Sequence, residues 1–208
     1  MSAACQYNIQ FPNQLNDLTA LKNLAQTLTA AGRLAELQSR PAEALSNYLD
    51  VMRFGIESGR GGFMIDALIG IAIEGMGRSH LEKLADHLEA TSCGLTAKAL
   101  ESLDSHCLVW DEVLRQEDIL QSRISPDVIS YLTARLVMHE FILEGRNKAG
   151  NKFRENQKET RNLAIQFAAR AYELEKGRRL TNIMELVPAY LKAIPQDPVT
   201  GKDLVYPR

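Results

Sequence analysis

Apolar residues recur every three or four positions along most of the chain, which is the spacing of an amphipathic α-helix. The first such stretch, at about residues 15–38, contains six leucines at this spacing: Leu15, Leu18, Leu21, Leu24, Leu28 and Leu34. Pro41 stands where the first turn of a second helix tolerates proline, and the pattern then continues towards residue 58. Beyond Gly61 and Gly62 the chain is almost wholly apolar, which predicts a central helix that reaches about residue 90.

The second half of the chain is also predicted to be helical, with breaks at residues 92–96 and 146–157. Apolar residues from Leu100 to Leu114 form a fourth stripe, and Ser125-Pro126-Asp127 predicts the start of a helix that ends before Gly145. Polar residues 146–157 are predicted to form a loop, and helices are expected at 158–176 and 181–192. Two prolines and a T-G-K turn then predict a short irregular or two-stranded tail.

These elements predict an all-α fold, with six to seven helices in a single bundle or helical-repeat-like domain. The composition agrees, because 45% hydrophobic and 24% charged residues with a net charge of -2 are typical of a globular protein. A chain of 208 residues buries one sizeable core, and no Pro/Gly/Ser-rich linker divides it. The single domain, 1–208, is divided as follows: a hairpin at 15–58, central helices at 62–145, a basic loop at 146–157, and C-terminal helices with the tail at 158–208.

Residues 28–56 resemble one tetratricopeptide helical hairpin. Gly32, Ala44 and Tyr48 match the small, small and aromatic positions of that repeat, and Arg40-Pro41 stands at its turn. The small residues allow two antiparallel helices to approach closely, and the aromatic ring fills the next gap. The chain contains one convincing copy, whereas a stable array needs about three.

Two acidic residues, Asp66 and Glu74, lie in the most apolar part of the chain. Burial of an unpaired carboxylate costs several kcal/mol, so each needs a partner, a raised pKa or water. Arg78 follows Glu74 by four residues and therefore shares its helical face. One interpretation makes Asp66, Glu74 and Arg78 ligand-binding residues around a polar pocket. The other is structural: an ion pair of Glu74 with Arg78, and a cap-like contact of Asp66 with a neighbouring helix end.

Basic residues are concentrated at the C-terminal end of the sequence. Residues 1–145 contain 11 Lys and Arg against 19 Asp and Glu, whereas residues 146–208 contain 13 against 7. Five of these basic residues are candidates for binding a polyanion: Lys148, Lys152, Arg154, Lys158 and Arg161. A solvated surface that complements the acidic front half is the favoured alternative, because the run has one aromatic residue and no recognised nucleic-acid motif.

Sequence motifs of catalytic and metal sites are missing. There is no G-x-S-x-G sequence, no phosphate-binding glycine loop and no metal-binding spacing among the four histidines. The cysteines, Cys5, Cys93 and Cys107, form no C-x-x-C pair. We therefore expect no catalytic residue, no metal and no cofactor.

Several stretches of the chain resemble a family of uncharacterised bacterial proteins: residues 5–11, R-P-A-E-A-L at 40–45, I-D-A-L-I-G-I-A-I at 65–73, and the tail 171–208. The tail is the most specific part, with A-Y-E-L-E-K-G-R, E-L-V-P-A-Y-L and I-P-Q-D-P-V-T-G-K-D-L-V-Y. Members of this family have no assigned activity and usually carry an N-terminal membrane anchor. The resemblance implies the extracytoplasmic face of a bacterial envelope if an anchor has been removed, and otherwise a cytoplasmic location.

The same tail is more distantly similar to the C-terminal part of type II secretion major pseudopilins, where a helix end also leads to a turn containing Asp-Pro. In this turn Asp197 can accept hydrogen bonds from its own backbone, Pro198 fixes φ, and Gly201 supplies a positive φ. These residues predict a structural clasp, and calcium or ligand binding at Asp197 is the alternative.

We expect a non-enzymatic helical scaffold that binds a protein or peptide through an exposed groove flanked by the first two helices. The alternative is a small-molecule binder or hydrolase that uses Asp66, Glu74 and Arg78. A polyanion-binding surface at residues 146–161 is a third hypothesis. No apolar run reaches the roughly 18 residues of a membrane span, no specific nucleic acid is expected, and a homodimer is possible.

Overall fold

The computed structural model describes residues 11–124 and 139–206, which contain six α-helices, two short 3₁₀ helices and no β-sheet. The α-helices are α1 (Phe11–Leu37), α2 (Pro41–Ser58), α3 (Met64–Leu84), α4 (Ala90–Ser105), α5 (Trp110–Ile124) and α7 (His139–Lys176). The 3₁₀ helices are η1 (Ala85–His87) and η2 (Ile183–Leu186). All pack into one domain, which confirms the predicted all-α fold.

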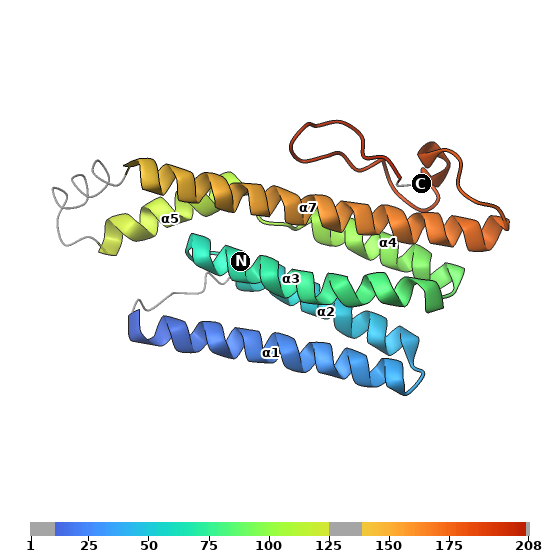
Figure 1. The fold of residues 1–208 in the computed structure, drawn as a ribbon, viewed down its shortest axis with the longest axis horizontal. Coiled ribbons are helices and arrows are strands. Elements are labelled where there is room, and N and C mark those ends of the chain that lie inside the picture. Colours follow the sequence, from blue (N-terminus) through green and yellow to red (C-terminus); the bar gives the residue numbers. More distant parts are fainter. Residues whose placement is uncertain (1–10, 125–138, 207–208) are drawn as a thin grey trace, which may run out of the picture.

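The helices lie roughly side by side in layers (Figure 1). Helix α1 forms one edge, α2 and α3 lie next to it, and α7 runs along the far side with α4 and α5. Helices α1 and α3 run in the same direction, with α2 antiparallel to both. The C-terminal tail folds back along the C-terminal half of α7, on the side away from α3.

Two apolar clusters of different size hold these layers together. The larger lies among α2, α3, α4, α7 and the tail, and includes Tyr48, Leu81, Leu100 and Phe167. The smaller is centred on three buried side chains of α1, α2 and α3: Ala25, Val51 and Ile73. The larger cluster buries more apolar side chains and therefore contributes more hydrophobic stabilisation than the smaller one.

The N-terminal hairpin has the close approach that its small residues predict. A Cβ atom added to Gly32 would overlap the ring of Tyr48, and both Ala44 and Tyr48 are completely buried. Pro41 is at the start of α2 as expected. The leucine stripe of α1 is only partly right, because Leu24 and Leu34 remain 47% and 52% exposed while Ala25 and Ala35 are buried instead.

Helix boundaries in the second half differ from the prediction. The predicted loop at 146–157 is wrong, since α7 continues unbroken from His139 to Lys176. Its polar side chains pair with one another and with neighbouring helices, and these pairs stabilise a helix at the surface. Residues 92–96 lie inside α4, and the expected end before Gly145 is also helical. The predicted helix start at 125–127 lies outside the described residues.

The tail is irregular, which is one of the two alternatives that the sequence predicts. A 3₁₀ turn at Ile183–Leu186 replaces the expected helix over 181–192, because Asn182 caps the turn and Pro188 follows it. A single antiparallel bridge joins Gln196 to Asp203 in the described part of the tail. Asp197 accepts hydrogen bonds from the backbone N–H groups of Val199 and Thr200, at 2.8 and 3.1 Å.

Candidate functional site

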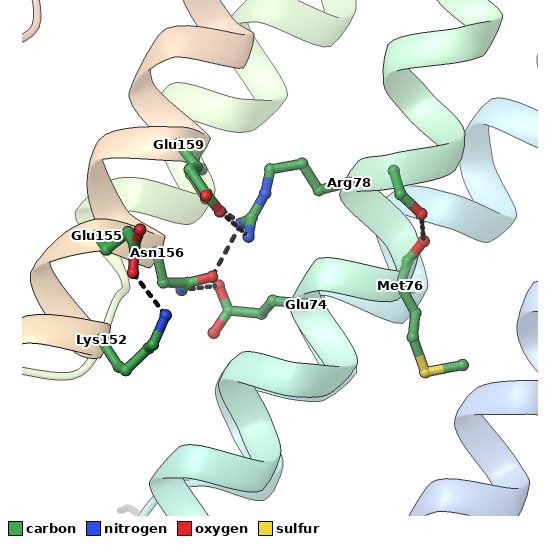
Figure 2. Close-up of polar contacts among 9 residues, drawn as sticks. Glu74, Met76, Arg78, Lys152, Glu155, Asn156 and Glu159 are labelled. Carbon is green, nitrogen blue, oxygen red and sulfur yellow. Dashed lines mark hydrogen bonds and ion pairs between the residues drawn. The ribbon is translucent and has the colours of Figure 1, made fainter. Parts of the chain in front are cut away.

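A buried polar network joins α3 to α7 (Figure 2). Asn156 of α7 donates from its Nδ2 to Glu74 Oε2 at 3.0 Å and accepts at its Oδ1 from Arg78 Nη1 at 2.8 Å. The same Nη1 donates to Thr160 Oγ1 at 3.2 Å, and Nη2 forms an ion pair with Glu159. Two of the three predicted ligand-binding residues therefore meet, through an amide that lies between them.

The arrangement differs from the direct Glu74–Arg78 ion pair that the sequence predicts. Arg78 directs its guanidinium towards α7 and pairs with Glu159, while Glu74 receives its hydrogen bond from the neutral amide of Asn156. Burial raises the pKa of Glu74 to about 7, against the smaller opposing effects of Asn156 and Arg78. A carboxyl group so buried is partly protonated near neutral pH.

Asp66 lies two helical turns away and has a different role. Its carboxylate accepts from the backbone N–H of Phe63 at 2.6 Å and so caps the N-terminus of its own helix, α3, rather than a neighbouring helix end. Glu117 of α5 accepts from the next N–H, that of Met64, at 2.6 Å. Burial, with a further contribution from Glu117, raises the pKa of Asp66. Two carboxylates thus accept hydrogen bonds from two of the free N–H groups at this helix end.

Three buried polar residues of these sites were missed in the sequence: Glu117, Asn156 and Thr160. The signal for the last two is their spacing, because Phe153, Asn156, Thr160 and Leu163 follow one another at threes and fours along α7. The expectation of a loop at 146–157 obscured this pattern. Glu117 has no comparable signal, because its partner is a backbone group of another helix.

The five basic residues proposed for polyanion binding all have polar partners. Lys148 pairs with Glu144, Lys152 with Glu155, and Arg154 bonds to Asn151. The other two join α7 to its neighbours: Lys158 pairs with Asp197 of the tail, and Arg161 pairs with Asp104 of α4. Four of the five partners are acidic, and two of these pairs tie α7 to the tail and to α4, which favours a structural role for the basic residues.

A third feature is the apolar surface where α1 and α3 lie side by side. We call it the α1–α3 surface and define it by four partly buried side chains that pack against the smaller cluster, together with Ile65 of α3; the four are Leu21, Leu28, Ile69 and Met76. Ile65 is the most open of them, at 52% exposed, and lies one turn before Ile69 on the same face of α3. The partly buried apolar side chains around the smaller cluster therefore come mainly from α1 and α3, and α2 contributes Phe54.

Metal-binding and membrane-spanning features are missing from the part of the chain that the structure describes. It has no group of three or more His, Cys, Asp or Glu residues placed to hold a metal ion. Within the same ranges, every helix is too short or too polar to cross a membrane.

The chain matches no known family model, and no curated protein or solved structure is significantly similar to it. The resemblance to a bacterial family therefore remains a prediction.

Proposed function

We propose that the protein is a non-enzymatic helical scaffold that binds a partner protein through the α1–α3 surface. The observation that carries the proposal is that Leu21, Leu28, Ile69 and Met76 pack against the smaller cluster without being fully buried, and that Ile65, one turn before Ile69, is 52% exposed. Apolar side chains gathered on one face lose contact with water when a partner covers them, and such patches are typical of interaction sites.

The partner chemistry that fits this surface is an amphipathic helix. From Ile65 to Met76, α3 offers three turns of one face, about 16 Å long at the rise of an α-helix. Leu21 and Leu28 of α1 run beside it. A partner helix with apolar residues at threes and fours would extend the row of α1 and α3, in the manner of helix-in-groove recognition.

The buried network supports a scaffold rather than a reaction centre. Glu74, Arg78 and Asn156 are each buried and use their polar atoms on one another and on Thr160 and Glu159. Such a network fixes the position of α3, and hence of the α1–α3 surface, against α7. Small-molecule binding at Asp66, Glu74 and Arg78 remains the alternative proposal, although Asp66 lies on another helix turn with partners of its own.

The experiment compares Ile65→Glu with Leu95→Glu in affinity capture followed by quantitative mass spectrometry. Leu95 is a matched control, because it is 63% exposed and lies on α4, away from the α1–α3 surface. We expect Ile65→Glu to lower the recovery of specific partners about tenfold, and Leu95→Glu to leave them unchanged. Equal recovery with both variants would refute the proposal.

A further inference from the structure

The segment that joins the end of α7 to η2 is exposed and carries two arginines and a threonine (Figure 1). Gly177 follows α7 in the left-handed region, at φ 64°, and residues 177–182 belong to no helix or strand. Arg178, Arg179 and Thr181 are all exposed. Exposed connections of this kind are where enzymes that modify a folded protein gain access to its chain. No part of the function proposed above uses this segment.

The order of residues in the segment suits an enzyme that recognises basic side chains. Arg178 and Arg179 stand three and two residues before Thr181, and they are the only two consecutive arginines of the chain. Protein kinases that select basic substrates bind arginines at these two positions through acidic side chains near the active site. The charge pattern therefore determines which hydroxyl group such a kinase phosphorylates.

The Thr181 hydroxyl is one of four donors around a single carboxylate, that of Glu185. Thr181 Oγ1 donates to Glu185 Oε1 at 2.8 Å, and the backbone N–H of Asn182 donates to the same oxygen at 3.2 Å. Arg178 and Tyr172 donate to Glu185 Oε2. The hydrogen bond from Arg178 is the largest of the effects that lower the pKa of Glu185 to about 2. An ionised carboxylate therefore links the segment to η2.

We propose that Thr181 is a phosphorylation site for a protein kinase that selects basic substrates, and that the phosphate takes Arg178 from Glu185. In this transfer Thr181 Oγ1 attacks the γ-phosphorus of ATP, the bond to ADP breaks, and the hydroxyl proton passes to a base of the kinase. The phosphate carries a charge of about -2 at pH 7 and has three strong acceptor oxygens. Arg178 is already directed at the same cluster and can donate to them.

Phosphorylation removes contacts that hold η2 in place. A phosphorylated Thr181 has no hydroxyl hydrogen to donate to Glu185, and its negative charge repels the Glu185 carboxylate. Glu185 also closes the capping box of η2 with Asn182. Loss of these contacts loosens the turn that ends at Leu186, which is buried in the larger apolar cluster. The modification therefore loosens the start of the C-terminal tail.

The test is incubation of the full chain with Mg-ATP and the catalytic subunit of cyclic-AMP-dependent protein kinase, which selects basic substrates. Cleavage after glutamate then gives a peptide of residues 176–185, on which mass spectrometry locates the phosphate. We expect phosphate on Thr181 and none on this peptide from Thr181→Val. Arg178→Gln and Arg179→Gln should each lower the initial rate about tenfold or more. Thr200 is the matched control, because it is exposed on the tail and no arginine is among the four residues before it.

The structural consequence is measured by hydrogen–deuterium exchange of the unmodified and the phosphorylated chain. We expect the amides of residues 183–191 to exchange at least about threefold faster after phosphorylation, and those of α4 to be unchanged. Three results would overturn the proposal: no phosphate on Thr181, equal rates for the wild type and both arginine variants, or unchanged exchange at 183–191. None of these measurements depends on the α1–α3 surface, so this proposal and the proposed function fail separately.

Discussion

Helix α3 is held against α2 and against α7 by different means. On the α2 side the backbones approach so closely that a Cβ atom on Gly70 would lie 2.5 Å from the carbonyl oxygen of Gly55. On the α7 side, Glu74 and Arg78 are joined to α7 by hydrogen bonds and an ion pair. The first contact depends on shape alone, whereas the second depends on charge and on pH.

Removal of the arginine from the α7 side is expected to have the largest effect. Arg78→Ala deprives Asn156 and Thr160 of their donor and takes the nearest positive charge from buried Glu74. We expect a loss of about 4 kcal/mol in the free energy of unfolding, because two buried acceptors lose their donor at a cost of roughly 1–3 kcal/mol each. Urea denaturation followed by circular dichroism measures it.

The control for this variant is Arg53→Ala, which breaks the exposed pair with Asp50. It should change stability by less than about 1 kcal/mol. If Arg78→Ala lowered the free energy of unfolding by no more than the control does, the network would not be what holds α3 to α7.

The pH dependence of Glu74 is expected to have the next largest effect. Its pKa is raised from 4.5 to about 7, so the folded state favours the protonated form. The destabilisation is therefore absent below pH 4.5, grows as the pH rises towards 7, and is complete above it. The full effect amounts to about 3 kcal/mol.

Glu74→Gln removes this titration and keeps an acceptor for Asn156. We expect the variant to match the wild type at pH 4.5 and to exceed its stability by about 3 kcal/mol at pH 8. Glu82→Gln, on an exposed part of the same helix, is the control. A stability difference that does not vary with pH would show that Glu74 stays ionised in the fold.

The sequence predicts the α2 side of α3 better than the α7 side. Helical spacing gives the fold class, the hairpin and the burial of Asp66, Glu74 and Arg78, because apolar periodicity reflects which face is inside. Partners on distant helices do not follow from local spacing. Asn156, Thr160 and Glu117 meet α3 only after α5 and α7 have packed, so the sequence favours the nearer pairing of Glu74 with Arg78.

The predicted helix boundaries are also wrong at residues 146–157, because contacts with distant residues decide them as well. Residues 146–157 are polar, and local composition therefore predicts a loop. Their helix is stabilised by pairs at threes and fours and by contacts with α5, such as Arg146 with Asp118. Composition alone does not distinguish a solvated helix from a loop.

On the α2 side, Gly70→Ala is expected to destabilise the protein by about 2 kcal/mol. Overpacking against the Gly55 carbonyl costs roughly 3 kcal/mol, and the better helix propensity of alanine returns about 1 kcal/mol. Gly145→Ala is the control, because Gly145 lies in α7 with no atom within 4 Å of the added Cβ. It should stabilise the protein by about 1 kcal/mol. Thermal and urea unfolding measure the stability of both variants. A Gly70→Ala variant as stable as Gly145→Ala would contradict the close approach of α3 to α2.

The smallest effect is expected on the α1 side of α3, where Ile65 is half exposed. Ile65→Glu should change the free energy of unfolding by about 0.5 kcal/mol or less, as is usual for surface positions. Ile73→Ala, two turns further along and 2% exposed, should cost at least about 2 kcal/mol. A large loss for Ile65→Glu would mean that the fold itself needs this side chain. A small one leaves Ile65 available to a partner, because its burial contributes little to the stability of the isolated chain.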